Sequence, residues 1–315
     1  MNEIFGKVLK NDIDYLKANQ LSLFLKDERG KNLIHYACLN ETTEVLQYLI
    51  DVGLNVNLRD FLGETALFDL ARKAKYNFIV LLIKAGINLN SYNNLGEIAL
   101  HLACKRGDLE VIKLLIETGS DITKRTNQFR LPLHYALSND DEKIFEYLLK
   151  LTNLGYQIYD DKRNCLLHYA ASYGSMKIAQ KLINDQFDVN YLNDFYETPL
   201  FSAVRNQQIE LVKYLLNQGA YIEIVNRRYE SVLMVASQSN PSLEKILLNY
   251  LESPTYQKYL DDNILTFCIL NRDFKQVQHL IFNKSPLIKD KYQKTALDYA
   301  KQYGLNSFVA ILLMK

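Results

Sequence analysis

Residues 60–68 read DFLGETALF and residues 193–201 read NDFYETPLF, so one pattern occurs twice in the chain. The leucine of this pattern, Leu67 in the first copy and Leu200 in the second, marks a position that recurs every 32 to 34 residues. Its occurrences are Ile34, Leu67, Leu100, Leu133, Leu167, Leu200, Leu233, Leu265 and Leu297. A period of this length indicates a repeat architecture, in which each unit packs on its neighbours.

Each repeat contains a second apolar block that follows the leucine. Three of these blocks read EVLQYLIDVG, EVIKLLIETG and ELVKYLLNQG, with apolar residues at helical spacing and a terminal glycine such as Gly119. Each unit is therefore expected to form a turn, a short helix, a tight reversal and a second helix. Because helices of this length are marginal alone, neighbouring units must stack to bury a continuous core.

The period and blocks such as LPLHYAL (131–137) and TPLFSAV (198–204) resemble the ankyrin repeat family. The resemblance implies an all-α fold: an ankyrin-repeat solenoid of stacked helix-turn-helix units with β-turn fingers, forming a single elongated domain. Residues 1–25 are expected to form an N-terminal capping helix pair. The nine repeats that follow are predicted at about 26–58, 59–91, 92–124, 125–158, 159–191, 192–224, 225–256, 257–288 and 289–315.

The eighth repeat departs most from the pattern and is degenerate. Between Leu251 and Asp262 it reads LESPTYQKYLDD, which lacks a finger glycine and contains Pro254. A local break in the stack is expected there. An alternative interpretation divides the array into two segments at this point.

Composition indicates a folded, soluble chain. Of its 315 residues, 48% are apolar and 23% are charged, and no apolar run reaches the roughly 18 residues of a membrane span. The net charge of +1 argues against a whole-molecule field for nucleic acid or membranes, although a local basic patch is compatible with it. The N-terminus lacks the basic and apolar segments of a secretory signal. We expect a cytoplasmic protein, or one in a host cytosol if it is a translocated effector.

Histidine and cysteine positions follow the repeat rather than a metal-binding motif. Four histidines occupy the slot after the leucine, namely His35, His101, His134 and His168. The family resemblance implies that each of them bonds backbone in the neighbouring turn. The four cysteines lie at least 61 residues apart, and Cys38 and Cys104 occupy small-residue core positions. We therefore expect no metal and no cofactor.

The sequence contains no motif for catalysis. A G-x-S-x-G elbow, a Gly-rich phosphate loop and an H-E-x-x-H segment are all absent from it. The adjacent acids Asp140–Asp141, Asp160–Asp161 and Asp261–Asp262 are assigned to connecting turns, where carboxylates are solvated and keep ordinary pKa values. No catalytic residue is predicted, and an enzyme built on the repeat surface is the least favoured alternative.

Local signals place the helix starts and the turns between repeats. The residue two before the leucine can cap the first helix in six repeats, through Asn32, Thr65, Thr198, Ser231, Asn263 and Thr295. The turns, called fingers below, begin seven residues before the leucine with an Asp or Asn in seven repeats. Such side chains fix turns through their own hydrogen bonds.

One finger position changes along the array. The residue four before the leucine is Gly30, Gly63 and Gly96 in the first three repeats, then Phe129, Arg163, Tyr196 and Tyr229 in the next four. Glycine suits a turn with a positive φ, and another residue in that conformation costs about 1–2 kcal/mol. Either the turn changes type or the cost is tolerated. The large residues are interpreted as interface anchors, with stacking on the neighbouring finger as the alternative.

The family resemblance implies a concave binding surface made of the fingers and the exposed ends of the first helices. The helix-end positions, five and six after the leucine, include five basic residues and no acid, which favours a protein partner with an acidic surface. A solvated basic face is the alternative, and nucleic acid is a weaker third option. The residues assigned to partner binding are Phe61, Leu62, Arg72, Lys73, Leu95, Lys105, Arg106, Phe129, Arg130, Arg163, Tyr173, Phe195, Tyr196, Arg205, Arg228 and Tyr229.

The sequence therefore predicts a non-enzymatic protein–protein interaction scaffold that is monomeric on its own. No small-molecule substrate, nucleic-acid partner or membrane partner is expected. An inhibitor, immunity protein or effector-type regulator of a target enzyme or toxin would use the same surface and is the main alternative.

Overall fold

The structure is a computed structural model that describes residues 3–281, 284, 288–290 and 292–314. Helices joined by turns account for these residues, and the β-type pairing among them is limited to single bridges such as that between Lys26 and Asn32. The predicted all-α repeat fold is thus confirmed.

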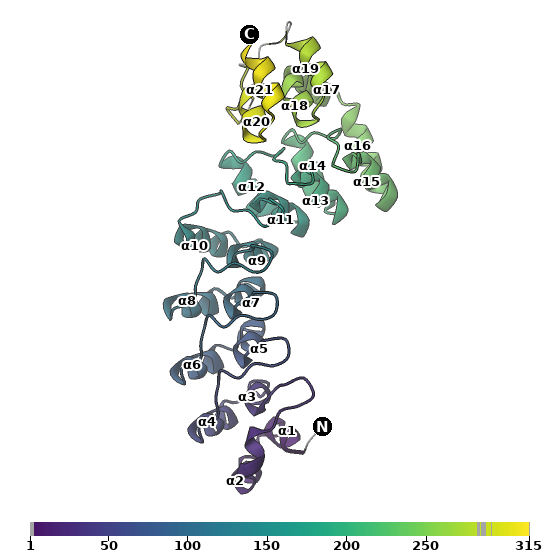
Figure 1. Cartoon of the computed structure of the whole chain (residues 1–315). Helices are drawn as coiled ribbons and strands as arrows, with labels where there is room; N and C mark the ends of the chain where they lie inside the picture. The colour runs from purple at the N-terminus through teal and green to yellow at the C-terminus, as the bar shows by residue number, and fades with distance from the viewer. Residues whose placement is uncertain (1–2, 282–283, 285–287, 291, 315) are drawn as a thin grey trace. The chain divides into compact units, whose positions relative to one another are not determined.

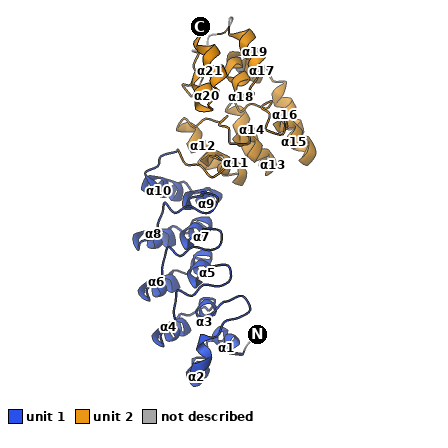
Figure 2. Cartoon of the chain, viewed as in Figure 1, with its two compact units in different colours: residues 1–156 blue, residues 157–315 orange. Residues whose placement is uncertain are grey.

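The chain forms two compact units, Met1–Tyr156 and Gln157–Lys315 (Figure 2). This division differs from the single domain expected from the sequence. Its boundary falls in the longest step of the repeat period, the 34 residues between Leu133 and Leu167. The second helix within this step has 11 residues, so both the helix and the connection after it depart from the regular repeat.

Unit 1 begins with a helix pair and continues with four repeats. The pair is α1 (Glu3–Leu9) and α2 (Ile13–Ala18), followed by the 3-10 helix η1 (Gln20–Phe24). The first helices of the repeats are α3 (Leu33–Ala37), α5 (Ala66–Lys73), α7 (Ala99–Arg106) and α9 (Pro132–Ala136), the last extended by the 3-10 helix η2 (Leu137–Asn139). The second helices are α4 (Glu44–Asp51), α6 (Tyr76–Lys84), α8 (Leu109–Glu117) and α10 (Glu142–Thr152). In Figure 1 the first helices form one row and the second helices another.

Unit 2 contains three regular repeats and a more irregular C-terminal part. The first helices of the regular repeats are α11 (Leu166–Tyr173), α13 (Pro199–Arg205) and α15 (Val232–Ser239). Their second helices are α12 (Met176–Asn184), α14 (Ile209–Asn217) and α16 (Pro241–Leu251). The C-terminal part comprises α17 (Pro254–Asp262), α18 (Ile264–Leu270), α19 (Phe274–Leu280), α20 (Ala296–Gln302) and α21 (Asn306–Leu313).

The recurring leucine position forms the centre of the core in both units. Seven of its nine residues are buried, and burying a leucine side chain stabilises a fold by about 1.5–3 kcal/mol. The exceptions are Leu233 and Leu297, which are half-buried. Both lie in unit 2, Leu233 in α15 and Leu297 in α20.

The eighth repeat interrupts the stack in unit 2. Helix α17 stands where a finger is expected, because Pro254 can begin a helix at a position that needs no backbone N–H. Helix α15 packs on α13 and α16, whereas α18 packs on α17, α19 and α20. The last two repeats contact the turns that end repeats five and six: the Phe267 and Tyr221 rings lie 5.5 Å apart, and the Leu192 N–H donates to the Tyr303 hydroxyl at 2.9 Å. The predicted junction between the last two repeats includes residues 282–283 and 285–287, which lie outside the described residues.

Helix capping follows the sequence prediction only in part. Three of the six predicted caps accept a bond from a backbone N–H, namely Asn32, Ser231 and Thr295. The other three do not, namely Thr65, Thr198 and Asn263. In the four repeats with a motif histidine, the N-cap N–H donates to the histidine Nδ1, as in the 2.9 Å bond from Leu131 to His134. The residue three after the cap therefore shares the capping function with the cap itself.

The N-terminal helix pair covers the first repeat of unit 1. Helix α1 packs on α3 and buries Ile4, Phe5 and Val8. The Asn40 side-chain amide donates to the Val8 carbonyl at 2.8 Å and so satisfies a C-terminal carbonyl of α1. The apolar end of the repeat stack is thereby kept from water, as a repeat array requires.

Candidate binding surface

Each finger is a five-residue turn held by its first side chain. In the second finger the Asp60 N–H donates to the Glu64 carbonyl and the Gly63 N–H to the Asp60 carbonyl, both at 2.9 Å. The Asp60 Oδ1 accepts from the Leu62 and Glu64 N–H groups, also at 2.9 Å. Thr126 holds the fourth finger in the same way through its hydroxyl, a role that the Asp/Asn pattern in the sequence did not reveal.

The fourth residue of each finger has a left-handed backbone conformation whether or not it is glycine. The angle φ is 78° at Gly30, Gly63 and Gly96, and it is 57°, 58°, 64° and 60° at Phe129, Arg163, Tyr196 and Tyr229. The turn therefore does not change type. The large residues adopt the glycine conformation and accept a strain of about 1–2 kcal/mol.

One backbone hydrogen bond joins each pair of successive fingers inside a unit. The N–H of the second residue in a finger donates to the carbonyl of the third residue in the finger before it. In unit 1 these bonds run from Phe61 to Arg29, from Asn94 to Leu62 and from Asn127 to Leu95, each at 2.9 Å. In unit 2 they run from Asp194 to Lys162 at 3.0 Å and from Arg227 to Phe195 at 2.9 Å. The tips are therefore held in register by the backbone.

The second residue of the following finger limits what the fourth position can hold. A Cβ on Gly96 would lie 2.7 Å from the Asn127 backbone nitrogen, so a side chain there would force the next finger away. In unit 2 the corresponding neighbour of Tyr196 is Arg227, whose guanidinium carbon lies 4.7 Å from the centroid of the tyrosine ring. The tyrosine of NDFYETPLF is thus accommodated by an arginine that stacks on it.

The predicted tip residues divide into exposed and packed side chains. Tyr229 is 83% exposed and Phe61 is 72% exposed. The other exposed members are Leu62, Leu95, Phe129, Phe195 and Arg228. Tyr196 is half-buried and is also covered by Arg272, whose guanidinium carbon lies 3.2 Å from the ring centroid. Tyr196 therefore serves packing, and we do not keep it among the free tips.

Three further predicted residues interact with their own unit. The Arg163 guanidinium donates to the Tyr191 hydroxyl at 3.1 Å. Arg130 is half-buried, and its backbone carbonyl accepts from the Thr126 N–H in closing the fourth finger. Tyr173 ends α11 with its ring exposed, 6.3 Å from the Tyr169 ring.

Two of the five predicted basic residues are neutralised by carboxylates of the same unit. The Arg72 guanidinium binds Glu64 through both oxygens, at 2.5 and 2.8 Å, and Arg205 binds Glu197 through both oxygens at 2.7 Å. The acid is the last residue of the finger and the arginine lies eight residues further on, in both repeats. These arginines hold a finger against its first helix, which limits their role in attracting an acidic partner.

The remaining basic residues of the helix ends lie in unit 1 and are free. Lys73 ends α5, and Lys105 and Arg106 end α7. All three are exposed, and none forms an ion pair with a described residue. Together with the exposed tips of unit 1 they combine apolar and basic groups. We call Phe61, Leu62, Leu95, Phe129, Lys73, Lys105 and Arg106 the unit 1 surface.

Three of the four motif histidines, His35, His101 and His168, bond backbone in the next finger, as the sequence predicts. Their Nδ1 accepts from the N-cap N–H, which leaves Nε2 to donate to a carbonyl in the next finger. His35 bonds the Glu64 carbonyl at 3.1 Å, His101 the Arg130 carbonyl at 3.3 Å and His168 the Glu197 carbonyl at 2.9 Å. Burial lowers the pKa of all three, to about 4 for His168, so they are neutral at pH 7.

The described residues contain no cluster of side chains that could form a metal site. No group of three or more His, Cys, Asp or Glu side chains among them could hold a metal ion. Burial raises the pKa of the Cys165 thiol to about 12, so it is not a reactive thiolate. Asp261 and Asp262 end α17 and do not lie in a connecting turn, which corrects the assignment made from the sequence.

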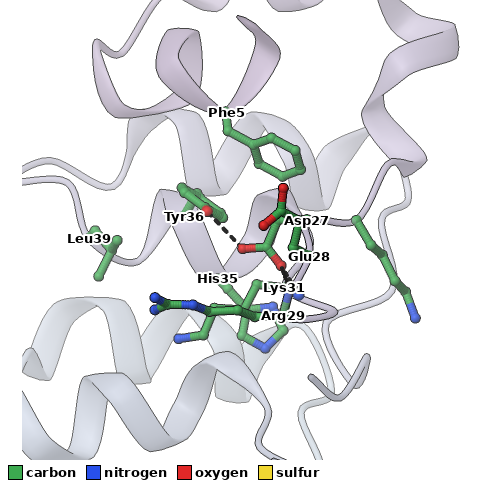
Figure 3. A pocket seen from close by; sticks show the side chains of 9 residues that line it. Phe5, Asp27, Glu28, Arg29, Lys31, His35, Tyr36 and Leu39 are labelled. Atoms are coloured by element: carbon green, nitrogen blue, oxygen red, sulfur yellow. Dashed lines mark hydrogen bonds between the residues drawn. The ribbon is translucent and has the colours of Figure 1, made fainter. Parts of the chain in front are cut away.

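A cavity of about 530 Å³ lies between the first finger and the N-terminal helix pair (Figure 3). Its walls include Phe5, Arg29, His35 and Leu39. The Asp27 carboxylate at its centre accepts from the Tyr36 hydroxyl at 2.8 Å and from the Lys31 N–H at 2.7 Å. Burial opposes ionisation of this carboxylate, but the hydrogen bonds outweigh it and lower the pKa of Asp27. The Asp27 carboxylate thus holds the first finger closed.

The fingers, the paired short helices and the histidine bonds between repeats recur in one known family. A model of this family, described as ankyrin repeats in three copies, matches residues 7–93, 70–161 and 153–226. The chain belongs to the ankyrin repeat family. Ankyrin repeats are generally protein–protein interaction modules.

The chain is similar to parts of several much larger ankyrin repeat proteins. It is 35% identical over 94 residues to "Transient receptor potential cation channel subfamily A member 1" of Homo sapiens, which is 29% of this chain and 8% of that protein. It is 30% identical over 100 residues to "Nuclear factor NF-kappa-B p105 subunit" of Gallus gallus, 30% of this chain and 10% of that protein. It is 27% identical over 154 residues to "Rabankyrin-5" of Mus musculus, 48% of this chain and 13% of that protein. The matches thus span at most about an eighth of these relatives.

A solved structure shows the same fold. The ankyrin repeat domain of human ASB11 superposes with a TM-score of 0.59 at 24% identity, over 71% of this chain and 100% of that chain. No helix among the described residues of the present chain combines the length and the apolar content that a membrane crossing requires.

Proposed function

We propose that this ankyrin repeat chain is a non-enzymatic module that binds a protein partner through the unit 1 surface. The observation that carries the proposal is the exposure of Phe61, Leu62, Leu95 and Phe129 on fingers that backbone bonds hold in register. Large apolar side chains on rigid turns supply contact area at little entropic cost. Exposed apolar groups gathered in this way are typical of interaction surfaces.

The charges of the unit 1 surface support a partner with acidic groups near its apolar contact. Lys73, Lys105 and Arg106 have no carboxylate partner among the described residues, so their fields extend into solvent. Such charges accelerate encounter with an acidic protein and weaken with salt. Arg72 is excluded from this role because Glu64 neutralises it. We further propose that the chain is cytoplasmic and monomeric on its own.

Affinity capture with a matched pair of variants tests this proposal. The first variant carries Leu62→Ser, Leu95→Ser and Phe129→Asn; asparagine tolerates the left-handed conformation of the fourth finger position. The control carries Leu151→Ser and Leu154→Ser, two exposed leucines of unit 1 that lie outside the fingers. We expect at least one protein to be retained by the wild-type chain and the control but lost by the finger variant. Equal retention of every captured protein by all three chains would refute the unit 1 surface.

A further inference from the structure

The fingers of unit 2 end in an unpaired edge. Each earlier step in this unit pairs a third-position carbonyl with the next finger, ending with the bond from the Arg227 N–H to the Phe195 carbonyl. The next acceptor in the series is the Arg228 carbonyl, and no backbone N–H of the described residues bonds to it. The eighth repeat cannot continue the series because α17 replaces its finger. The Arg228 carbonyl can therefore accept a hydrogen bond from a backbone N–H of another chain.

Tyr229 shows the same interruption in its side chain. Tyr196, in the sixth finger, is covered by Arg227 of the seventh finger. Tyr229 occupies the corresponding position in the seventh finger, with the same left-handed backbone, but it has no following finger and is 83% exposed. The site that the eighth finger would fill is therefore open beside an aromatic ring.

A cavity of about 570 Å³ lies beside this edge. It is lined by Tyr196, Val225, Asn226, Arg227, Tyr229, Asn271 and Arg272. Within this lining the Val225 N–H donates to the Asn271 Oδ1 at 3.0 Å. The cavity is thus bounded by the seventh finger on one side and by the end of α18 on the other.

Two cations in this cavity lack a carboxylate partner among the described residues. The guanidinium carbons of Arg227 and Arg272 lie 4.7 and 3.2 Å from the centroid of the Tyr196 ring, so they are less than about 8 Å apart. Arg272 is half-buried, and its guanidinium donates to the Leu270 carbonyl at 2.9 Å. Burial lowers the pKa of Arg272, and the Arg227 charge acts in the same direction. An anion bound beside the two guanidinium groups would stabilise the half-buried charge of Arg272, which otherwise lies near the like charge of Arg227.

We propose that an extended acidic segment of a partner protein binds at this edge in place of the missing eighth finger. One backbone N–H of the segment donates to the Arg228 carbonyl, a side chain packs on Tyr229, and an Asp or Glu carboxylate binds Arg227 and Arg272. The site requires both a backbone donor and an anion, which favours a peptide over a nucleic acid. This inference goes beyond the proposed function, because it concerns unit 2 and does not use the unit 1 surface.

Fluorescence anisotropy with a defined peptide tests the inference on the full chain. The probe is a fluorescein-labelled Gly-Ser-Asp-Glu-Asp-Glu-Ser-Gly peptide, and its counterpart has Asn and Gln in place of Asp and Glu. The test variant carries Arg227→Gln and Arg272→Gln. The control variant carries Lys143→Gln and Lys150→Gln, two exposed lysines of α10 that lie outside the unit 1 surface, and so removes the same charge from unit 1. We expect saturable binding of the acidic probe, weakened at least tenfold in the test variant and less than twofold in the control.

Several outcomes would overturn the inference. The first is that the acidic probe does not bind even at millimolar concentrations of the chain. The second is that the Asn/Gln peptide binds as tightly as the acidic probe. The third is that the test and control variants bind the acidic probe with equally weakened affinity. Displacement of the probe by equimolar inorganic phosphate would assign the site to a free anion instead. Tighter binding of a single-stranded oligonucleotide than of the peptide would assign it to nucleic acid. Because Arg272→Gln removes the closer of the two arginine contacts to Tyr196, the single Arg227→Gln variant, which keeps that contact, is measured too and is expected to bind the acidic probe at least threefold more weakly than the wild-type chain.

None of these results decides whether the unit 1 surface binds a partner, because that surface is tested separately by affinity capture. If the unit 1 surface proves correct and the acidic probe does not bind, the inference fails alone. If the probe binds as expected and the finger variant loses no partner, the unit 1 surface fails and the acidic site stands.

Discussion

Replacement of the large fourth-position residues by glycine separates backbone strain from side-chain packing. Tyr229 and Tyr196 have the same left-handed backbone, with φ of 60° and 64°, but only Tyr196 is packed. In Tyr229→Gly the strain of about 1–2 kcal/mol is removed. The greater conformational freedom of glycine in the unfolded chain offsets about 0.5–1 kcal/mol of this gain. We therefore expect Tyr229→Gly to stabilise unit 2 by about 0.5–1 kcal/mol.

The same substitution at Tyr196 should have the opposite sign. The backbone gain is equal, but two arginine–aromatic contacts are lost, each contributing about 0.5–2 kcal/mol depending on its exposure. Loss of the half-buried ring area adds to this cost. The expected net effect of Tyr196→Gly is a destabilisation of about 1–2 kcal/mol, and the two variants should differ by about 2 kcal/mol.

Urea unfolding followed by far-ultraviolet circular dichroism provides the assay. Because a repeat array can unfold in steps, the transition assigned to unit 2 is compared between the two variants and the wild-type chain. The reasoning is refuted if Tyr229→Gly destabilises as much as Tyr196→Gly. It is also refuted if both variants stabilise, because the arginines would then contribute nothing to packing.

The other predictions concern the histidine, glycine and arginine positions. Burial lowers the pKa of His168 to about 4 from an unfolded value near 6.5. The stability that the neutral side chain contributes is therefore complete above pH 6.5 and falls by about 3 kcal/mol as the pH drops towards 4. His168→Gln should flatten the pH dependence of the urea unfolding midpoint. Gly96→Ala should destabilise unit 1 by at least about 1–2 kcal/mol, measured by thermal unfolding, because its Cβ would meet the Asn127 backbone; an unchanged midpoint would contradict the packing. Arg205→Ala should cost about 1–2 kcal/mol in the same assay because it leaves the nearly buried Glu197 without its ion-pair partner, and Arg205→Ala with Glu197→Gln should recover part of the loss.

The periodic features could be predicted from the sequence because the fold repeats them. The nine copies of one pattern were enough to predict which leucines lie in the core. The histidines could be predicted from their shared position in the repeat alone. The left-handed finger position was also visible as Gly30, Gly63 and Gly96. What the pattern left open was whether Tyr196 alters the turn, since the answer depends on a contact made by Arg227 in another repeat.

Features that depend on pairs of positions were missed. Arg72 and Arg205 were expected to face a partner, although Glu64 and Glu197 precede them by eight residues in the same two repeats, a spacing that could have signalled the ion pairs. The site beside Arg272 could not be predicted either. It requires the last two repeats to pack on turns of repeats five and six, and no periodic signal specifies that arrangement.

The free energy of binding carried by the fingertips of unit 1 is the quantity on which the account rests. It is measured by titration calorimetry of a captured partner against three chains: the wild type, the variant with Leu62→Ser, Leu95→Ser and Phe129→Asn, and the control with Leu151→Ser and Leu154→Ser. We predict that the finger variant binds with a Kd at least tenfold weaker, a loss of about 1.4 kcal/mol, and that the control stays within twofold of the wild type. An unchanged Kd for the finger variant, with a tenfold weaker Kd for the control, would contradict it.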